Sequence, residues 1–340
     1  MVQDNELSPP KERTKRAYLL LGIKLVVTIL ILSYIYKTFS NEQKGIGDIG
    51  EVFGSILNAE HLATILLILA LVPVNWAFES LKWQKLVGKV IKLSFWEAFR
   101  GTLTGLAVGV AAPAQLGDTI GRIAALKSDR RLEAIGAALV SNGIQFYVSV
   151  VAGAWGWFQI QQRLLLAETS KQLLSLLLVL IIILGIATIW LKKPVTEWKP
   201  EKAFFKKIQS YIRIIGSYSS GEIGFATLLG AFRYLIFLSQ FVLALSLFDL
   251  PVSVIDLISC VSLIFLAKTL IPAINVLGDL GLREFTALLV FASYDLPPER
   301  IIAATFLVWI VNVLGPILIG IFLIWKYKWK AVRMQEKRLR

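Results

Sequence analysis

The chain has 340 residues, of which 56% are hydrophobic, and its mean hydropathy is +0.69. A soluble domain of this size could not bury so much apolar surface, so lipid must form part of the surroundings of the protein. The net charge of +13 does not indicate nucleic-acid binding, because the basic residues lie in short segments beside apolar runs, where they set membrane topology.

The N-terminal segment combines a basic tail with an apolar stretch. Residues 1–16 are polar and basic, and residues 17–36 are apolar. The apolar stretch is longer than that of a secretory signal peptide, and no small-residue cleavage site follows it. We therefore expect a cytoplasmic tail and a retained membrane anchor.

Further apolar runs are long enough for helices that cross about 30 Å of hydrocarbon. Two other stretches, residues 99–126 and 271–291, contain Pro, Gly and a charged pair, which indicates broken or re-entrant elements. We predict an all-α polytopic membrane protein with about seven or eight transmembrane helices. Its single transmembrane domain covers residues 17–326, and residues 327–340 form a basic tail. The predicted spans are residues 17–36, 61–78, 134–158, 172–191, 223–248, 254–271 and 301–325.

Basic segments predict the orientation, because cytoplasmic loops are enriched in Lys and Arg. The N-terminal tail, the loop after the second span and the loop at residues 192–213 are therefore expected in the cytoplasm. The loop after the second span contains Lys82, Lys85, Lys89 and Lys92. Residues 200–220 predict an amphipathic connector, which either lies on the inner leaflet or covers the ends of neighbouring helices.

The basic C-terminus conflicts with a simple count of seven crossings, which would leave it outside. Either residues 271–298 cross the membrane as a broken helix, or the charge rule fails at this end. We favour a cytoplasmic C-terminus.

A motif of the form Leu-Gly-Asp-x-x-x-Arg occurs twice. The first copy contains Asp118 and Arg122, and the second contains Asp279 and Arg283. Each copy precedes a polar turn and then an apolar helix with an asparagine, which is Asn142 or Asn312. The matching order predicts two half-repeats, at about residues 61–158 and 223–326, as in many transporters. The predicted turn residues of the two copies are Pro113, Gly117, Gly121, Pro272, Gly278 and Gly281.

The chemistry of the motif favours an anion site. Aspartate and arginine four residues apart share one helix face and can form an ion pair. A charge at membrane depth is costly and normally faces a wet cavity or the bundle interior. The helix N-terminus after each break would attract a phosphate or carboxylate. Two copies predict a shared electropositive pocket between the halves.

Other polar residues within the spans support the same hypothesis. Arg233 lies about eleven residues into its span, roughly 16 Å deep, with Gln240 on the same face. The alternative is that the amides only join helices by hydrogen bonds. We expect no catalytic residue and no metal site, and we treat Glu79 as a residue near a span end. The candidate substrate-binding residues are Arg122, Arg283, Arg233, Asp118, Asp279, Glu284, Asn142, Gln145 and Asn312.

Between residues 17 and 325 the sequence resembles the flippase-like family named for the transmembrane region of lysylphosphatidylglycerol synthase, which is related to the multiple peptide resistance factor. The resemblance rests on residues 113–122, on the run from Gly281 to Glu284, on the helices after them and on the basic middle loop. It implies a polytopic protein that moves aminoacylated phosphatidylglycerol between leaflets. Two positions depart from the family pattern, since members commonly have glutamate at Asp118 and glycine at Asp279.

The sequence and the resemblance together predict a translocator of a lipid or lipid-linked precursor in the cell membrane. Its expected partners are anionic phospholipids. We expect no cofactor, because no phosphate-binding loop of the Gly-x-x-x-x-Gly-Lys-Ser/Thr type is present. We also expect no lipid synthesis, because only fifteen residues follow Trp325. Two alternatives remain open: a membrane-embedded transferase acting on a lipid-linked substrate, and an accessory scaffold for a lipid-modifying synthase.

Overall fold

The computed structural model describes residues 49–110, 116–197, 213–271 and 282–338, together with isolated positions within residues 22–40 and 199–209. These residues form helices, and no strand occurs among them, which confirms the all-α prediction. Most of the predicted span at residues 17–36 lies outside the described residues, as do eight residues of the predicted connector at residues 200–220, whose last part contains the short helix Arg213–Ser217.

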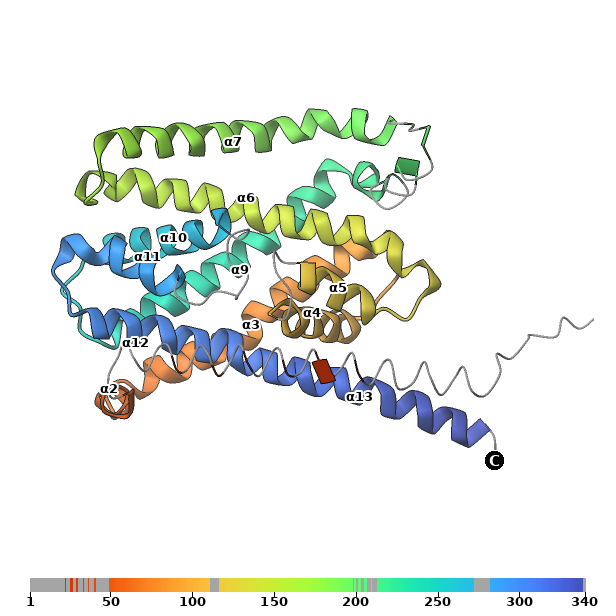
Figure 1. The fold of residues 1–340 in the computed structure, drawn as a ribbon, viewed down its shortest axis with the longest axis horizontal. Helices are drawn as coiled ribbons and strands as arrows, with labels where there is room; N and C mark the ends of the chain where they lie inside the picture. Colours follow the sequence, from red (N-terminus) through yellow and green to blue (C-terminus); the bar gives the residue numbers. More distant parts are fainter. Residues whose placement is uncertain are drawn as a thin grey trace, which may run out of the picture.

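Long apolar helices run side by side through the molecule (Figure 1). Five segments of the described chain are long and apolar enough to cross a membrane, which confirms a multi-pass membrane protein. Many of their leucine and isoleucine side chains are exposed, as expected of a surface in contact with lipid. The long helices are α3 (Leu62–Val87), α6 (Ile135–Ile160), α7 (Glu168–Glu197), α9 (Ser220–Ser246) and α13 (Gly315–Arg338), which continues α12 (Pro298–Trp309) through the π-helical segment Ile310–Leu314.

Shorter helices form two hairpins. Helix α4 (Phe95–Gly109) packs against α5 (Leu116–Ala124), and α10 (Val254–Leu270) packs against α11 (Leu282–Phe291). The first hairpin lies in the right half of Figure 1 and the second in the left half. A further short helix, α2 (Ile49–Ile56), contacts α12 at the left end.

Helix α10 covers residues 254–270 of the predicted span at residues 254–271, and it is shorter than its neighbour α6. It runs antiparallel to α6, because Asp256 pairs with Arg163 while Leu266 meets Gly153. Only four residues of α10 follow Leu266, whereas eighteen residues of α6 precede Gly153. About 21 Å of α6 therefore continues beyond the end of α10. With 17 residues, α10 is at the lower limit of length for a helix that crosses a bilayer.

Serine caps begin three of the helices. Ser94 and Glu97 form a reciprocal capping box at the start of α4, and Ser219 and Glu222 form another at the start of α9. Ser253 accepts a hydrogen bond from a backbone N–H at the start of α10. Such caps satisfy backbone N–H groups that have no partner inside the helix.

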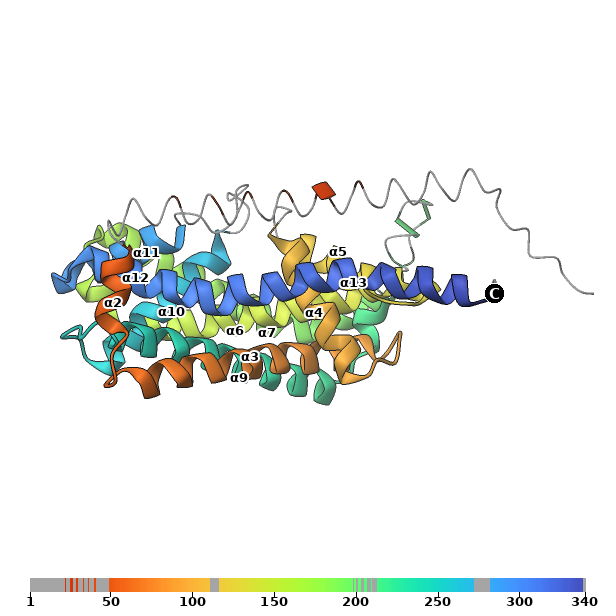
Figure 2. The ribbon, with the colours of Figure 1, turned by 90° about the horizontal axis from the view of Figure 1, so that it is seen from below.

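The described helices recur in the same order in both parts of the chain: a long helix, two short helices and another long helix. The first series is α3, α4, α5 and α6, and the second is α9, α10, α11 and α12 with α13. The first long helices of the two series, α3 and α9, pack along each other on one face of the molecule (Figure 2).

Each short hairpin packs along the last long helix of the other series. Helix α4 lies against α13, where a Cβ atom at Gly320 would be only 2.3 Å from the carbonyl oxygen of Leu103. Helix α10 lies against α6, where a Cβ atom at Gly156 would be 2.8 Å from the carbonyl oxygen of Ser259. Glycine at these positions permits backbones to approach closely, as at many helix contacts in membranes.

Candidate functional site

Helix α3 carries charged side chains inside the bundle. It continues to Val87, nine residues beyond the predicted span end at residue 78. Glu79 and Lys82 lie on it with side chains only 3% and 1% exposed. The prediction that Lys82 belongs to a cytoplasmic loop is therefore wrong. A hydropathy profile falls at any charged residue. It therefore cannot distinguish a charged residue that is paired inside the bundle from one that lies in water.

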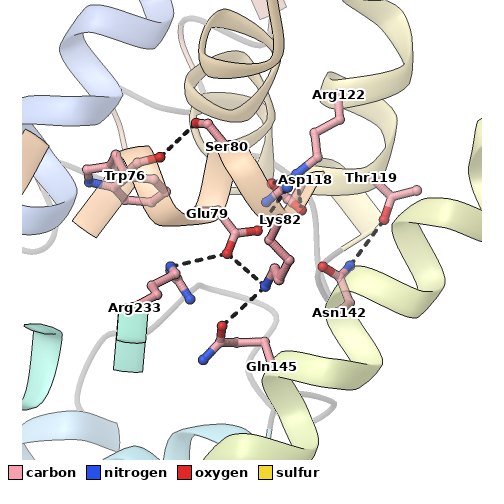
Figure 3. A network of polar contacts seen from close by, with 10 residues as sticks. All are labelled: Trp76, Glu79, Ser80, Lys82, Asp118, Thr119, Arg122, Asn142, Gln145 and Arg233. Atoms are coloured by element: carbon pink, nitrogen blue, oxygen red, sulfur yellow. Dashed lines mark hydrogen bonds and ion pairs between the residues drawn. The ribbon is translucent and has the colours of Figure 1, made fainter. Parts of the chain in front are cut away.

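The carboxylate of Glu79 lies at the centre of a polar network (Figure 3). Its Oε2 is 2.8 Å from Lys82 Nζ and 3.2 Å from Arg233 Nε, and its Oε1 is 2.9 Å from Arg122 Nη1. These four side chains come from α3, α5 and α9. One buried acid thus joins three bases and three helices.

The ion pair predicted within the first motif is present. Arg122 Nε lies 2.9 Å from Asp118 Oδ2, one turn earlier on α5. The guanidinium also lies over the ring of Trp83, with Cζ 5.7 Å from the ring centroid. Arg122 therefore contacts two carboxylates and an aromatic face, and its side chain is only 5% exposed.

Arg233 lies at the middle of α9 and has fewer partners. Its Nε contacts Glu79, and its Cζ lies 5.5 Å from the ring centroid of Trp76. Among the described residues, neither terminal nitrogen of its guanidinium has a hydrogen-bond or ion-pair partner. The side chain is 19% exposed, more than those of the other two bases of the network.

Two amides of α6 complete the network. Gln145 accepts a hydrogen bond from Lys82 Nζ at 3.2 Å, and Asn142 donates one to Thr119 of α5 at 3.4 Å. Both are residues that the polar stripe of this helix predicted, and both join helices by hydrogen bonds. Gln240, predicted on the face of Arg233, instead donates to the carbonyl oxygen of Ile68.

The described network carries one uncompensated positive charge. It contains three basic side chains and two carboxylates, which leaves a net charge of +1. A buried charge is costly unless another charge or a ligand compensates it. We name these five residues the Glu79 cluster: Glu79, Lys82, Asp118, Arg122 and Arg233.

Glycines hold α5 close to α4. Gly117 and Gly121 were predicted as turn residues, but both lie within α5. A Cβ atom at Gly117 would be 2.4 Å from the carbonyl oxygen of Val108, and one at Gly121 would be 2.8 Å from Gly105 Cα. These glycines therefore permit helix contact, which brings Asp118 against α4. Glycine serves turns and close contacts equally well, so its identity alone could not separate the two roles.

The described part of the second motif, Leu282 and Arg283, lies elsewhere in the molecule. Arg283 and Glu284 form a buried ion pair on α11, in the half of the molecule opposite to α5 (Figure 1). Asn312, on the π-helical segment, accepts a hydrogen bond from Asn75 of α3 at 3.4 Å. The remaining predicted residues lie outside the described part of the chain: Asp279, Pro113, Pro272, Gly278 and Gly281.

Sequence reasoning missed part of the network. Glu79 and Lys82 were not proposed as site residues, and neither were the aromatic partners Trp76 and Trp83. The sequence signal that could have identified them was their spacing, because Trp76, Glu79 and Trp83 recur at intervals of three and four residues and so share one helix face.

The residues with described side chains contain no group of three metal-ligating side chains of the His, Cys, Asp or Glu type.

Comparison with known families identifies a match over most of the chain. The family described as "Lysylphosphatidylglycerol synthase TM region" matches residues 21–320. No curated protein shows a significant match.

Proposed function

Because the chain belongs to the lysylphosphatidylglycerol synthase TM region family, we propose that it moves a lipid or lipid-linked precursor between the leaflets of the membrane. The anionic headgroup of this cargo would bind at the Glu79 cluster. The observation that supports the proposal most is the unbalanced positive charge of that cluster, buried between helices long enough to span a bilayer.

The depth of the cluster supports a role in crossing the membrane. Arg233 lies thirteen residues after Ser220, the first residue of α9, which corresponds to about 20 Å along the helix axis. A side chain at that depth cannot easily extend to the headgroup layer. Charges at such positions commonly mark pathways for substrates or ions.

We propose that the chain lies in the cell membrane with both termini in the cytoplasm. The end of α13 lies at the same end of the molecule as the turn between α5 and α6, which contains Arg130 and Arg131 (Figure 1). The sequence around both is basic, and basic segments favour the cytoplasm. We propose that α10, which has 17 residues against the 26 of α6, does not cross the membrane, and removing this crossing from the predicted seven resolves the conflict at the C-terminus.

We further propose transport without a cofactor, rather than catalysis. The full sequence contains one histidine and one cysteine, and no phosphate-binding loop of the Gly-x-x-x-x-Gly-Lys-Ser/Thr type. Movement of the lipid would then follow its gradient or an ion gradient.

Reconstitution into liposomes tests the proposal. Vesicles containing a fluorescent phosphatidylglycerol are treated with a quencher that cannot cross the bilayer, so movement between leaflets appears as additional quenching. We expect quenching to increase with wild-type protein and to fall for Arg122→Ala and Arg233→Ala, which change bases of the Glu79 cluster. The matched control is Arg130→Ala, because the Arg130 side chain is 61% exposed and, in the described part of the chain, pairs only with Glu133. Activity that persists in both variants would overturn the proposal.

A further inference from the structure

We infer that the Glu79 cluster selects a phosphodiester with one net negative charge, and that Arg233 makes the direct contact with it. The inference rests on the proposed function and adds two details to it, namely the charge of the headgroup and the residue that contacts the headgroup.

The charge of the headgroup follows from the balance of the cluster. The described residues leave one positive charge without a partner in the membrane interior. A ligand with a single negative charge makes the occupied site neutral. A zwitterionic headgroup leaves the positive charge in place, and a dianionic headgroup leaves a negative one. Because an unbalanced buried charge is disfavoured, the monoanion is the preferred guest.

Two of the three bases are already occupied. Lys82 Nζ contacts Glu79 and Gln145, and its side chain is almost completely buried. Arg122 bridges Asp118 and Glu79 and stacks on Trp83. A ligand that contacted either base directly would have to displace these partners.

Arg233 is the base that remains available. Only its Nε is paired, while its two terminal nitrogens have no partner among the described residues. Its contact with Trp76 holds the plane of the guanidinium. A planar guanidinium presents parallel N–H donors that match two oxygens of a phosphate group. The geometry therefore assigns the phosphodiester to Arg233.

The experiment compares headgroups and charge variants in the same liposome assay. The probes are fluorescent phosphatidylglycerol with one negative charge, phosphatidylcholine with none, and phosphatidic acid with up to two. We expect the wild-type protein to move phosphatidylglycerol at least about tenfold faster than phosphatidylcholine, a preference of about 1.4 kcal/mol. Soluble glycerophosphoglycerol is added as a competitor, to separate a lipid ligand from a free phosphodiester.

Three variants change the net charge or the geometry of the cluster. Arg233→Gln removes the excess charge, so we expect the preference for phosphatidylglycerol over phosphatidylcholine to disappear. Asp118→Asn raises the excess to two, so we expect the preference to move toward phosphatidic acid. Arg233→Lys keeps the charge but lacks the planar guanidinium with its parallel N–H donors. We therefore expect a reduced rate of lipid movement with the preference for phosphatidylglycerol retained. The control is Arg163→Gln, because the Arg163 side chain is 58% exposed and pairs with Asp256, outside the Glu79 cluster.

The outcomes separate this inference from the proposed function. If the wild-type protein moves no lipid, the translocator proposal fails, and binding of glycerophosphoglycerol without lipid movement would identify a site for a free phosphodiester instead. If the wild-type protein moves phosphatidylglycerol and phosphatidylcholine equally, the charge inference fails while the translocator proposal stands. The assignment to Arg233 fails if Arg233→Gln keeps the wild-type preference in protein that remains monodisperse on size-exclusion chromatography.

Discussion

Glu79 Oε1 lies 2.9 Å from Arg122 Nη1, so a buried ion pair joins the long helix α3 to the short helix α5. The other oxygen of the same carboxylate contacts Lys82 and Arg233. Glu79 thereby compensates charges on three helices, and the arrangement of the bundle depends on it.

Replacing Glu79 should therefore be severely destabilising. The Glu79→Ala variant would leave three buried bases with a single carboxylate, and loss of one partner from a buried ion pair costs about 3–5 kcal/mol. We expect a large fall in the midpoint of thermal unfolding in detergent. This midpoint is measured by size-exclusion chromatography with fluorescence detection.

The control for Glu79 is Glu222→Gln. Glu222 pairs with Lys89 at 2.8 Å where both side chains are more than a third exposed, and such pairs contribute little. Glutamine also preserves the capping interaction with Ser219. Equal unfolding midpoints for the two variants would show that the Glu79 cluster does not stabilise the fold.

A second prediction concerns the contact between α4 and α5. We expect Gly117→Ala to force the helices apart, because its Cβ would lie 2.4 Å from the carbonyl oxygen of Val108. Overpacking of this kind costs about 1–3 kcal/mol, measured as a change in the free energy of unfolding. Gly143→Ala on α6 is the matched control, because a Cβ there has no neighbour within 4 Å. Similar stability of the two variants would contradict the close contact.

The hydrogen bond between Asn75 and Asn312 should contribute much less than the ion pairs. Its donor–acceptor distance is 3.4 Å, and interhelical hydrogen bonds in membranes couple by about 0.6 kcal/mol on average. A double-mutant cycle with Asn75→Ala and Asn312→Ala measures that coupling. A value above about 2 kcal/mol would indicate that these amides belong to a larger network.

Cysteine labelling tests the placement of the two hairpins. The only natural cysteine, Cys260, is buried, and replacing it gives a protein with no thiol that the reagent can label. We expect Arg131→Cys, after the first hairpin, and Ser293→Cys, after the second, to react with a membrane-impermeant thiol reagent from opposite sides of the membrane. Reaction of both from the same side would contradict the topology proposed above.

The sequence predicted the features that depend on local spacing. The all-helical membrane fold followed from apolar runs, and the pair of Asp118 and Arg122 followed from their separation of one helical turn. Glu79 and Lys82 were missed because their partners come from α5, α6 and α9, and no pattern within α3 specifies that those helices lie opposite it. Gly117 was assigned to a turn because its close neighbour, Val108, belongs to a helix whose position the sequence does not give.

The hairpins also limit how this protein can move. Helix α4 is seated on α13 through Gly320, and α10 is seated on α6 through Gly153 and Gly156. Each part of the chain therefore packs a hairpin against a long helix of the other part. The two parts cannot separate as independent rigid bodies unless both of these contacts break. Motion that preserves these contacts has to leave each hairpin in place on the long helix of the other part.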